Sequence, residues 1–298
     1  MTDPEPTLTG LRGEIDRLDD ALVDVLARRA RLVAAIGSLK GADGSPVMRP
    51  GREAEILRRL LARADGDLDG AAMVRIFREI VSAAVRQQGV FSVAASMPAT
   101  GPSCWALARD HYGAATPIKP MAGPAQVVAA VADGTVSVGI VPYPMSEEAP
   151  PWWPPLMAEG VPRVVARLPA AEGLAPADGC TEGLALAMMT PEPSGDDRSL
   201  VALEIEKGLG RSRVRDGFDA AELTVRSTWS HSVGEHDHPV GYLAEVDGFL
   251  APESPALASL AVTLGEAAPR IAVIGAFAVP PRLGAGPESG GPPPGEGS

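Results

Sequence analysis

The chain has 298 residues, a mass of 30.7 kDa and 45% hydrophobic residues, which is enough for two packed domains and excludes wholesale disorder. Its formal net charge of −12 and pI near 4.8 argue against a nucleic-acid binder, because such proteins present a basic face. The longest apolar run, residues 271–281, is shorter than the roughly 18 residues of a membrane span, and only two cysteines occur, so we expect a cytoplasmic protein without membrane contact.

Residues 8–40 have the pattern of one long amphipathic helix. Apolar residues recur alternately every three or four positions, and Thr9 is suited to cap the start. At about 1.5 Å per residue the helix would be roughly 45 Å long, longer than a small domain is wide. We therefore expect it to pack against a partner, most simply another copy of the chain. The apolar positions are Leu11, Ile15, Leu18, Leu22, Val25, Leu32, Ile36 and Leu39.

Two cations lie on this apolar face. Arg29 stands between Val25 and Leu32 where the pattern requires an apolar residue, and Lys40 follows about three turns later on nearly the same face. Burying either cation unpaired would cost on the order of several kcal/mol. Two interpretations stay open: each cation meets a carboxylate of a neighbouring helix, or the two together bind an anion.

Two further helices are expected before residue 90. Pro50 opens the second, with Arg52 and Glu53 in its first turn, where the helix dipole alone already favours a carboxylate. Asp67 or Asp69 can cap the third, whose buried stripe continues onto Gln88. An amide at the end of an apolar stripe needs a hydrogen-bond partner.

Over residues 8–90 these features together resemble the all-helical (type II) chorismate mutases. The stretches that carry the resemblance are Leu11–Asp19, Arg28–Val33 and Gly51–Leu57, together with Lys40 and the terminal Gln88 at helical spacing. The resemblance implies an intertwined homodimer of three-helix chains that rearranges chorismate to prephenate. This intramolecular reaction of a dicarboxylate needs no nucleophile, cofactor or metal, only a compact conformer held among cations.

The family pattern implies a role for four catalytic residues. Arg29 is expected to bind a substrate carboxylate, and Lys40 together with Gln88 to face the breaking ether oxygen. Glu53 is expected to hold the ring hydroxyl. No catalytic triad is expected.

Two more arginines are expected to bind substrate, and two positions depart from the pattern. Arg52 would line the ring side of the pocket, and Arg12 would reach across the dimer to the second carboxylate. Arg49 stands where some family members carry an Asp, and Ala84 where they carry a Ser, which affects substrate contacts more than the reaction class. The same scaffold hosts isochorismate pyruvate lyases, a minor alternative.

Residues 91–195 change to a βαβ-like succession that ends in a buried strand at residues 136–142. Over about 60 residues this succession resembles the start of the prephenate dehydratase domain. The Thr-Arg-Phe segment of that family is missing, since residues 183–191 read Gly-Leu-Ala-Leu-Ala-Met-Met-Thr-Pro. We therefore expect a degenerate, non-catalytic dehydratase-like α/β lobe.

Residues 197–282 have the βαββαβ order of an ACT regulatory domain, with Val246-Asp-Gly-Phe and Ile274-Gly-Ala-Phe at corresponding places. The resemblance implies an α+β domain that binds phenylalanine or tyrosine as an effector, or only packs. Residues 283–298, rich in Gly, Pro and Glu, are expected to be a disordered tail.

Two local clusters invite functional interpretations that we do not favour. His231, His236 and His238 with Glu235 and Asp237 fit no standard metal spacing, so we expect a polar hairpin loop and no metal. The pair Trp152-Trp153 among prolines is more typical of a rigid turn pinned to a core than of a ligand-stacking site.

The sequence thus predicts a multidomain protein with an all-α mutase domain at 8–90, followed by the lobe at 91–195 and the domain at 197–282. The predicted function is chorismate mutase, an isomerase of phenylalanine and tyrosine biosynthesis, with a regulatory or structural C-terminal region. The alternatives are a bifunctional chorismate mutase/prephenate dehydratase and a catalytically silent sensor of aromatic amino acids. The intact set of four cations, Arg12, Arg29, Lys40 and Arg52, argues against the sensor.

Overall fold

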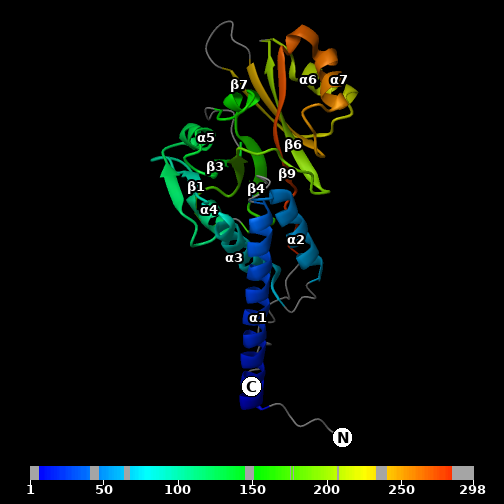
Figure 1. Ribbon diagram of the computed structural model, residues 1–298. Helices are drawn as coiled ribbons and strands as arrows, with labels where there is room; N and C mark the ends of the chain where they lie inside the picture. Colours follow the sequence, from blue (N-terminus) through cyan, green and yellow to red (C-terminus); the bar gives the residue numbers. More distant parts are fainter. Residues whose placement is uncertain are drawn as a thin grey trace, which may run out of the picture. The chain divides into compact units, whose positions relative to one another are not determined.

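The computed structural model describes residues 7–40, 47–63, 68–144, 151–174, 176, 178–206, 208–232 and 240–283 (Figure 1). The chain divides into two compact units, which are described separately. One comprises residues 1–48 and 83–90, and the other residues 49–82 and 91–298. Among the described residues, no helix is both long and apolar enough to cross a membrane.

The first unit is built on α1 (Leu8–Lys40), a single helix of 33 residues, as the apolar spacing predicts. Its first turn is capped by Thr7, whose Oγ1 accepts the Gly10 amide at 3.1 Å. The prediction of Thr9 as N-cap is therefore wrong, because Thr9 already lies inside the helix. The end of α3 (Gly70–Gln88) completes the unit, and Gly37 lies close to it, since a Cβ there would be 3.0 Å from Cγ of Gln88.

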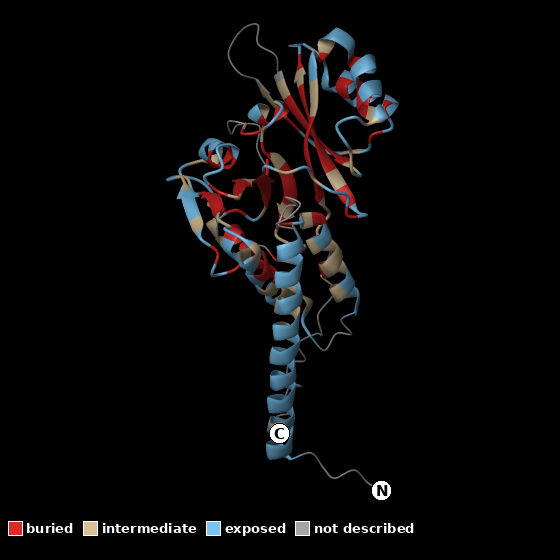
Figure 2. Ribbon diagram, viewed as in Figure 1, coloured by how far each residue is buried: buried red, intermediate tan, exposed pale blue. Residues whose placement is uncertain are grey.

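The apolar side chains of α1 are exposed along its whole length (Figure 2). Relative exposure ranges from 49% at Ile36 to 74% at Leu39. An apolar stripe on a helix is stabilising only when another surface covers it. That a second copy covers this face stays a prediction.

The second unit holds α2 (Pro50–Arg63), the first part of α3 and one mixed sheet of nine strands in the order β2-β1-β3-β5-β4-β9-β6-β8-β7. The strands are β1 (Val93–Ser96), β2 (Ile118–Met121), β3 (Val138–Pro142), β4 (Arg163–Leu168), β5 (Gly183–Ala187), β6 (Asp197–Ile205), β7 (Val225–Ser232), β8 (Val240–Asp247) and β9 (Arg270–Ala278). The helices are α4 (Trp105–Tyr112), α5 (Pro124–Ala132), α6 (Arg211–Ala220) and α7 (Pro255–Leu264), with 3₁₀ turns at Pro154–Met157 and Gly265–Ala267.

The βαβ succession predicted after residue 90 is confirmed. β1 pairs in parallel with β2 and with β3, and α4 and α5 form the two crossovers. α5 lies flush against β3 because Gly139 carries no side chain, since a Cβ there would be 2.4 Å from Cγ1 of Val127. The fold is thus α/β at this end of the sheet.

The βαββαβ order predicted for the last part is present as β6-α6-β7-β8-α7-β9, with the strands side by side as β9-β6-β8-β7. α6 and α7 share a core with this part of the sheet, in which Phe218 and Leu260 are fully buried. This is a ferredoxin-like arrangement. Its identification as an ACT-like domain stays a prediction.

The two parts of the sheet are joined between β4 and β9. The joint is a parallel pairing of Val164 with Gly275. Gly275 has φ +154°, and a Cβ on it would lie 2.2 Å from the carbonyl oxygen of Val164, so glycine is required. The α/β part and the βαββαβ part therefore share one continuous sheet.

The Trp152-Trp153 pair is pinned, as its proline-rich setting predicts. The two side chains are 7% and 5% exposed, and Trp152 Nε1 donates to the carbonyl of Pro142 at 3.1 Å. Of the histidine cluster only His231 is described, at the end of β7. His236, His238, Glu235 and Asp237, and tail residues 284–298, lie outside the described residues.

Candidate active site

The predicted site residues of the first unit lie on α1 and at the end of α3. Arg29 is half-buried, Arg12 is exposed, and Lys40 is the last residue of α1. Eleven residues separate Arg29 from Lys40, which is about 16 Å along the helix axis. Arg12 and Arg29 are separated by about 25 Å and point to different faces, so one α1 cannot aim both at the same small substrate.

Gln88 shows the buried amide that the sequence anticipated. Its Nε2 donates to the Ala84 carbonyl of its own helix at 3.0 Å. Its Oε1 is buried and has no hydrogen-bond partner among the described residues. A buried polar atom without a partner is costly, and the second N–H of Nε2 can still donate to a ligand.

Glu53 lies in the first turn of α2, in the second unit, and is held by an arginine that the sequence analysis missed. Arg78 Nη1 donates to Glu53 Oε2 at 2.7 Å, with the side chains 4% and 12% exposed. The same guanidinium donates through Nε to the carbonyl of His111 at 2.7 Å. A signal was present, because Arg78 continues the buried stripe of Val74 and Val81 on α3.

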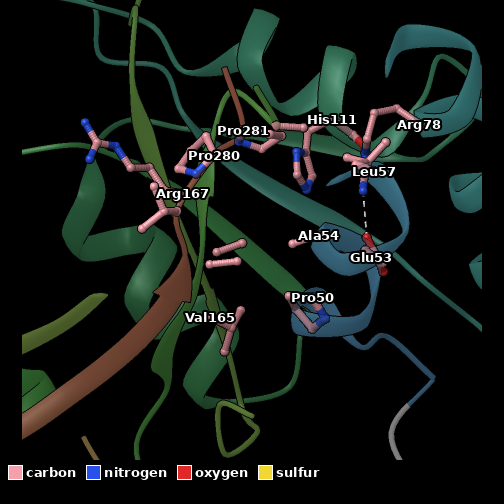
Figure 3. A pocket seen from close by; sticks show the side chains of 14 residues that line it. Pro50, Glu53, Ala54, Leu57, Arg78, His111, Val165, Arg167, Pro280 and Pro281 are labelled. Atoms are coloured by element: carbon pink, nitrogen blue, oxygen red, sulfur yellow. Dashed lines mark hydrogen bonds and ion pairs between the residues drawn. The ribbon is translucent and has the colours of Figure 1, made fainter. Parts of the chain in front are cut away.

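A cavity of about 30 Å³, room for one water, adjoins this ion pair (Figure 3). Glu53, Arg78 and His111 line it together with apolar residues. Burial lowers the pKa of His111 well below its usual range, and the nearby Arg78 guanidinium lowers it further. His111 is therefore neutral, and its Nδ1 is buried without a partner in the described part of the chain.

Arg52 on α2, and Arg49 just before it, are both exposed. Arg52 pairs with Glu55 at 2.7 Å, an exposed contact within one helix that contributes little. Arg49 Nη2 lies 2.7 Å from Glu192 Oε2, also exposed. Arg49 therefore belongs to the joint between α2 and the chain before β6.

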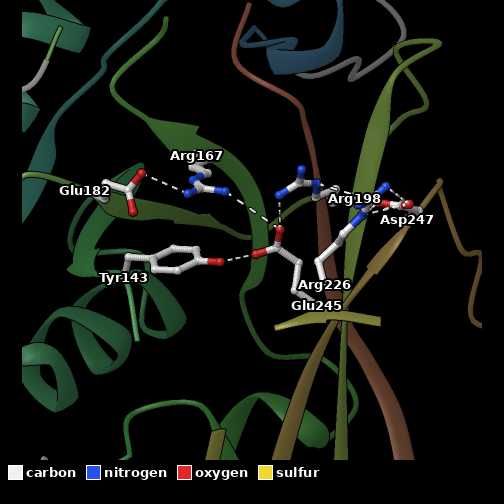
Figure 4. Close-up of polar contacts among 7 residues, drawn as sticks. All are labelled: Tyr143, Arg167, Glu182, Arg198, Arg226, Glu245 and Asp247. Carbon is white, nitrogen blue, oxygen red and sulfur yellow. Dashed lines mark hydrogen bonds and ion pairs between the residues drawn. The ribbon is translucent and has the colours of Figure 1, made fainter. Parts of the chain in front are cut away.

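A second polar cluster lies in the sheet and was not predicted (Figure 4). Glu245 on β8 is fully buried, accepts a hydrogen bond from the Tyr143 hydroxyl and pairs with Arg198. Arg167 lies 3.7 Å from the Glu245 carboxylate, 2.8 Å from Glu182 and 4.4 Å above the Tyr143 ring. Burial and the Glu245 carboxylate raise the pKa of Tyr143, so its hydroxyl stays protonated.

This cluster borders a cavity of about 300 Å³ lined in part by Arg167, Glu182 and Arg198. Its charges are largely compensated by one another. Within the described residues, no group of three or more His, Cys, Asp or Glu side chains is placed to hold a metal ion.

The family model of type II chorismate mutases matches residues 11–89. Over 77 residues the chain is 36% identical to a 4-amino-4-deoxychorismate mutase of Streptomyces venezuelae, a match that covers 25% of this chain and 74% of that protein. Through its N-terminal helices, the chain belongs to the type II chorismate mutase family.

Other relatives are named as enzymes with two activities. Bifunctional chorismate mutase/prephenate dehydratases of Pseudomonas aeruginosa and Stutzerimonas stutzeri are 36% and 34% identical over 146 residues, covering 47% of this chain and 40% of each relative. The matched 47% of 298 residues is about 140, against 79 in residues 11–89, so at least about 60 matched residues lie outside the mutase segment. The chain spans well under two thirds of the length of these relatives.

Among solved structures, a prephenate dehydratase of Streptococcus mutans matches with a TM-score of 0.46 and 18% identity, over 65% of this chain and all of that chain. A prephenate dehydratase of Arthrobacter aurescens matches with a TM-score of 0.47 and 13% identity, over 66% of this chain and 93% of that chain.

Proposed function

We propose that the protein is a chorismate mutase that rearranges chorismate to prephenate without a cofactor. The observation that carries the proposal is that the residues with expected roles, Arg29, Lys40, Glu53 and Gln88, all fall within the family segment 11–89. The reaction is unimolecular, so the protein has to hold one reactive conformer and stabilise the charge that develops on the ether oxygen.

The proposed roles follow the chemistry of the side chains. Arg29 binds one substrate carboxylate, because a guanidinium matches a carboxylate in a bidentate fork. Lys40 and Gln88 donate to the ether oxygen as its bond to carbon breaks, and Glu53 accepts from the ring hydroxyl. Arg52 lines the ring side of the pocket.

The proposal includes a dimer with a shared pocket. The uncovered apolar face of α1 supports it, and so does the wide separation of Arg12 from Arg29 on that helix. A second copy would cover the face and bring its own Arg12 to the remaining substrate carboxylate. The partner is therefore a second copy of this chain rather than a different protein.

The C-terminal region, divided as 91–195 and 197–282, is proposed to be regulatory or structural. The missing Thr-Arg-Phe segment argues against dehydratase activity, whereas the names of the relatives favour it. Phenylalanine or tyrosine is the proposed effector class, and the cytoplasm the proposed compartment. Bifunctional activity is the alternative.

The test gives purified protein chorismate and identifies the products before and after mild acid. Prephenate as the sole enzymatic product, converted to phenylpyruvate only by the acid, is the expected result. Phenylpyruvate formed without acid would establish the bifunctional alternative. Unchanged chorismate would contradict the proposal and favour the silent sensor.

A further inference from the structure

We propose that Arg78 is a positioning residue that fixes the Glu53 carboxylate in place and couples it to the C-terminal α/β region. The inference rests on the proposed function, because it takes Glu53 as the group that binds the substrate hydroxyl. All residues that carry it belong to one compact unit.

The two oxygens of the Glu53 carboxylate have different surroundings. Oε2 accepts from Arg78 Nη1 at 2.7 Å, whereas Oε1 accepts no hydrogen bond from any described residue. A carboxylate can accept several hydrogen bonds, so Oε1 stays available to a substrate hydroxyl while Oε2 is held. Arg78 thereby orients the acceptor without occupying it.

The burial of the pair makes this orientation strict. Arg78 is 3% exposed, and its other hydrogen bond among the described residues goes to the carbonyl of His111. If Glu53 rotated away, the guanidinium would be left buried without its carboxylate, which is a costly arrangement. The planar fork of Arg78, fixed at Nε and Nη1 by acceptors from two elements, therefore confines Glu53 to one rotamer.

The second acceptor links the carboxylate to the C-terminal region. His111 lies in the last turn of α4, which crosses between β1 and β2 of the parallel part of the sheet. Leu57 of α2 and Val74 of α3 also pack in one apolar cluster with Ala171 and Leu174, which follow β4. A displacement of α4 would move the His111 carbonyl, then Arg78, then Glu53. The α/β region, which lacks the Thr-Arg-Phe segment, would in this way influence the mutase reaction.

Arg58 provides a matched control on the same helix. Its guanidinium also binds α2 to the C-terminal region, through the carbonyls of Ser194, Asp196 and Val279 at 2.6 to 3.0 Å. It contacts none of the residues with proposed roles in the reaction. Arg58→Lys therefore weakens the attachment of α2 without touching Glu53.

The experiment is a double-mutant cycle on the full chain, with kcat and KM for chorismate measured for each variant. Arg78→Lys keeps the charge but loses the fork, and we expect its kcat/KM to fall about 10- to 100-fold, as for a misplaced catalytic group. In a Glu53→Gln background the same change is expected to cost less than about twofold, because there is no carboxylate left to position. Arg58→Lys is expected to lower the thermal midpoint while kcat/KM stays within about twofold.

The outcomes separate the two proposals. Arg78→Lys with unchanged kcat/KM, or an equal loss in both backgrounds, would make the ion pair purely structural and overturn the inference while the mutase activity stands. Wild-type protein that leaves chorismate unchanged would instead refute the proposed function, and the inference with it. If Arg78→Lys does not fold, the Arg78→Gln/Glu53→Gln pair, in which amides replace both charges, is compared with Glu53→Gln alone, and equal kcat/KM is the supporting result.

Discussion

Helix α1 and the nine-stranded sheet differ in which side chains they bury. On α1 the residues that the pattern marks as core are open to solvent, with Leu18 61% exposed and Leu32 61% exposed. In the sheet, the Glu245 carboxylate is fully buried and its charge is met by Arg198 and the Tyr143 hydroxyl. The sheet pairs this buried charge within its own unit, whereas the apolar face of α1 is exposed.

The difference indicates which substitutions should affect stability and which should affect association and catalysis. An amphipathic helix gains most of its stability from the surface that covers its apolar face, so under the proposed dimer α1 is stabilised by the second copy. The sheet unit has its own core, and we expect its substitutions to change the free energy of unfolding. Substitutions on α1 should instead change association and catalysis.

The largest expected effect tests the self-sufficiency of the sheet. Glu245→Gln removes the buried charge that Arg198 and Arg167 share and leaves Arg198 only its longer contact with Asp247 at 3.8 Å, so we expect a loss of about 3–5 kcal/mol of unfolding free energy. Urea unfolding followed by circular dichroism measures it. The control is Glu204→Gln in neighbouring β6, whose pair with Arg270 at 3.3 Å is partly exposed and should matter by less than about 1 kcal/mol. Equal losses in the two variants would show that the cluster does not hold the sheet.

The same contrast explains what the sequence could predict. Period and spacing are local, so they gave α1, the βαβ succession and the βαββαβ order. Contacts between distant segments produce no periodic pattern in the sequence. Glu245, Arg198 and Tyr143 lie far apart in the chain, so their contact could not be predicted. Arg78 was visible as a cation on a buried stripe, but its two acceptors come from different elements, and only the fold brings them together.

The next effect tests α1 as the catalytic element. Arg29→Ala, and likewise Lys40→Ala, is expected to lower kcat about 10²- to 10³-fold, as for the loss of one preorganised donor. Arg31→Ala, two residues along and exposed, is the control and should keep kcat near that of the wild type. Steady-state assays with chorismate measure both. Wild-type kcat in Arg29→Ala would refute the placement of the substrate carboxylate on α1.

A smaller effect tests what covers α1. Leu22→Asp places a charge on the apolar face, and losing the burial of this side chain costs about 1.5–3 kcal/mol for each copy, so the dimer dissociation constant should rise at least roughly 10-fold. Val23→Asp makes the same change at a residue that is 65% exposed and outside the stripe, and should leave association unchanged. Sedimentation over a dilution series measures both. A wild-type monomer at all concentrations would mean that a second copy does not cover this face.

The smallest expected effect is a pH dependence located in the sheet unit. Burial lowers the pKa of His111, whereas an unfolded histidine titrates near about 6.5. Below that pH the unfolded chain binds a proton that the folded chain does not, so the unfolding free energy falls as pH falls, by at most about 1.4 kcal/mol per pH unit.

His111→Phe keeps a buried ring and removes the titration, so its unfolding free energy should change less between pH 7.5 and 5.5 than that of the wild type. This window lies above the range in which the carboxylates titrate, including Asp247, whose pKa the Arg226 contact lowers. Chemical unfolding of both proteins at several pH values measures the difference in slope. If the slope persists with phenylalanine at position 111, the acid sensitivity comes from another group, and the His111 carbonyl then serves Arg78 without its imidazole titrating in this window.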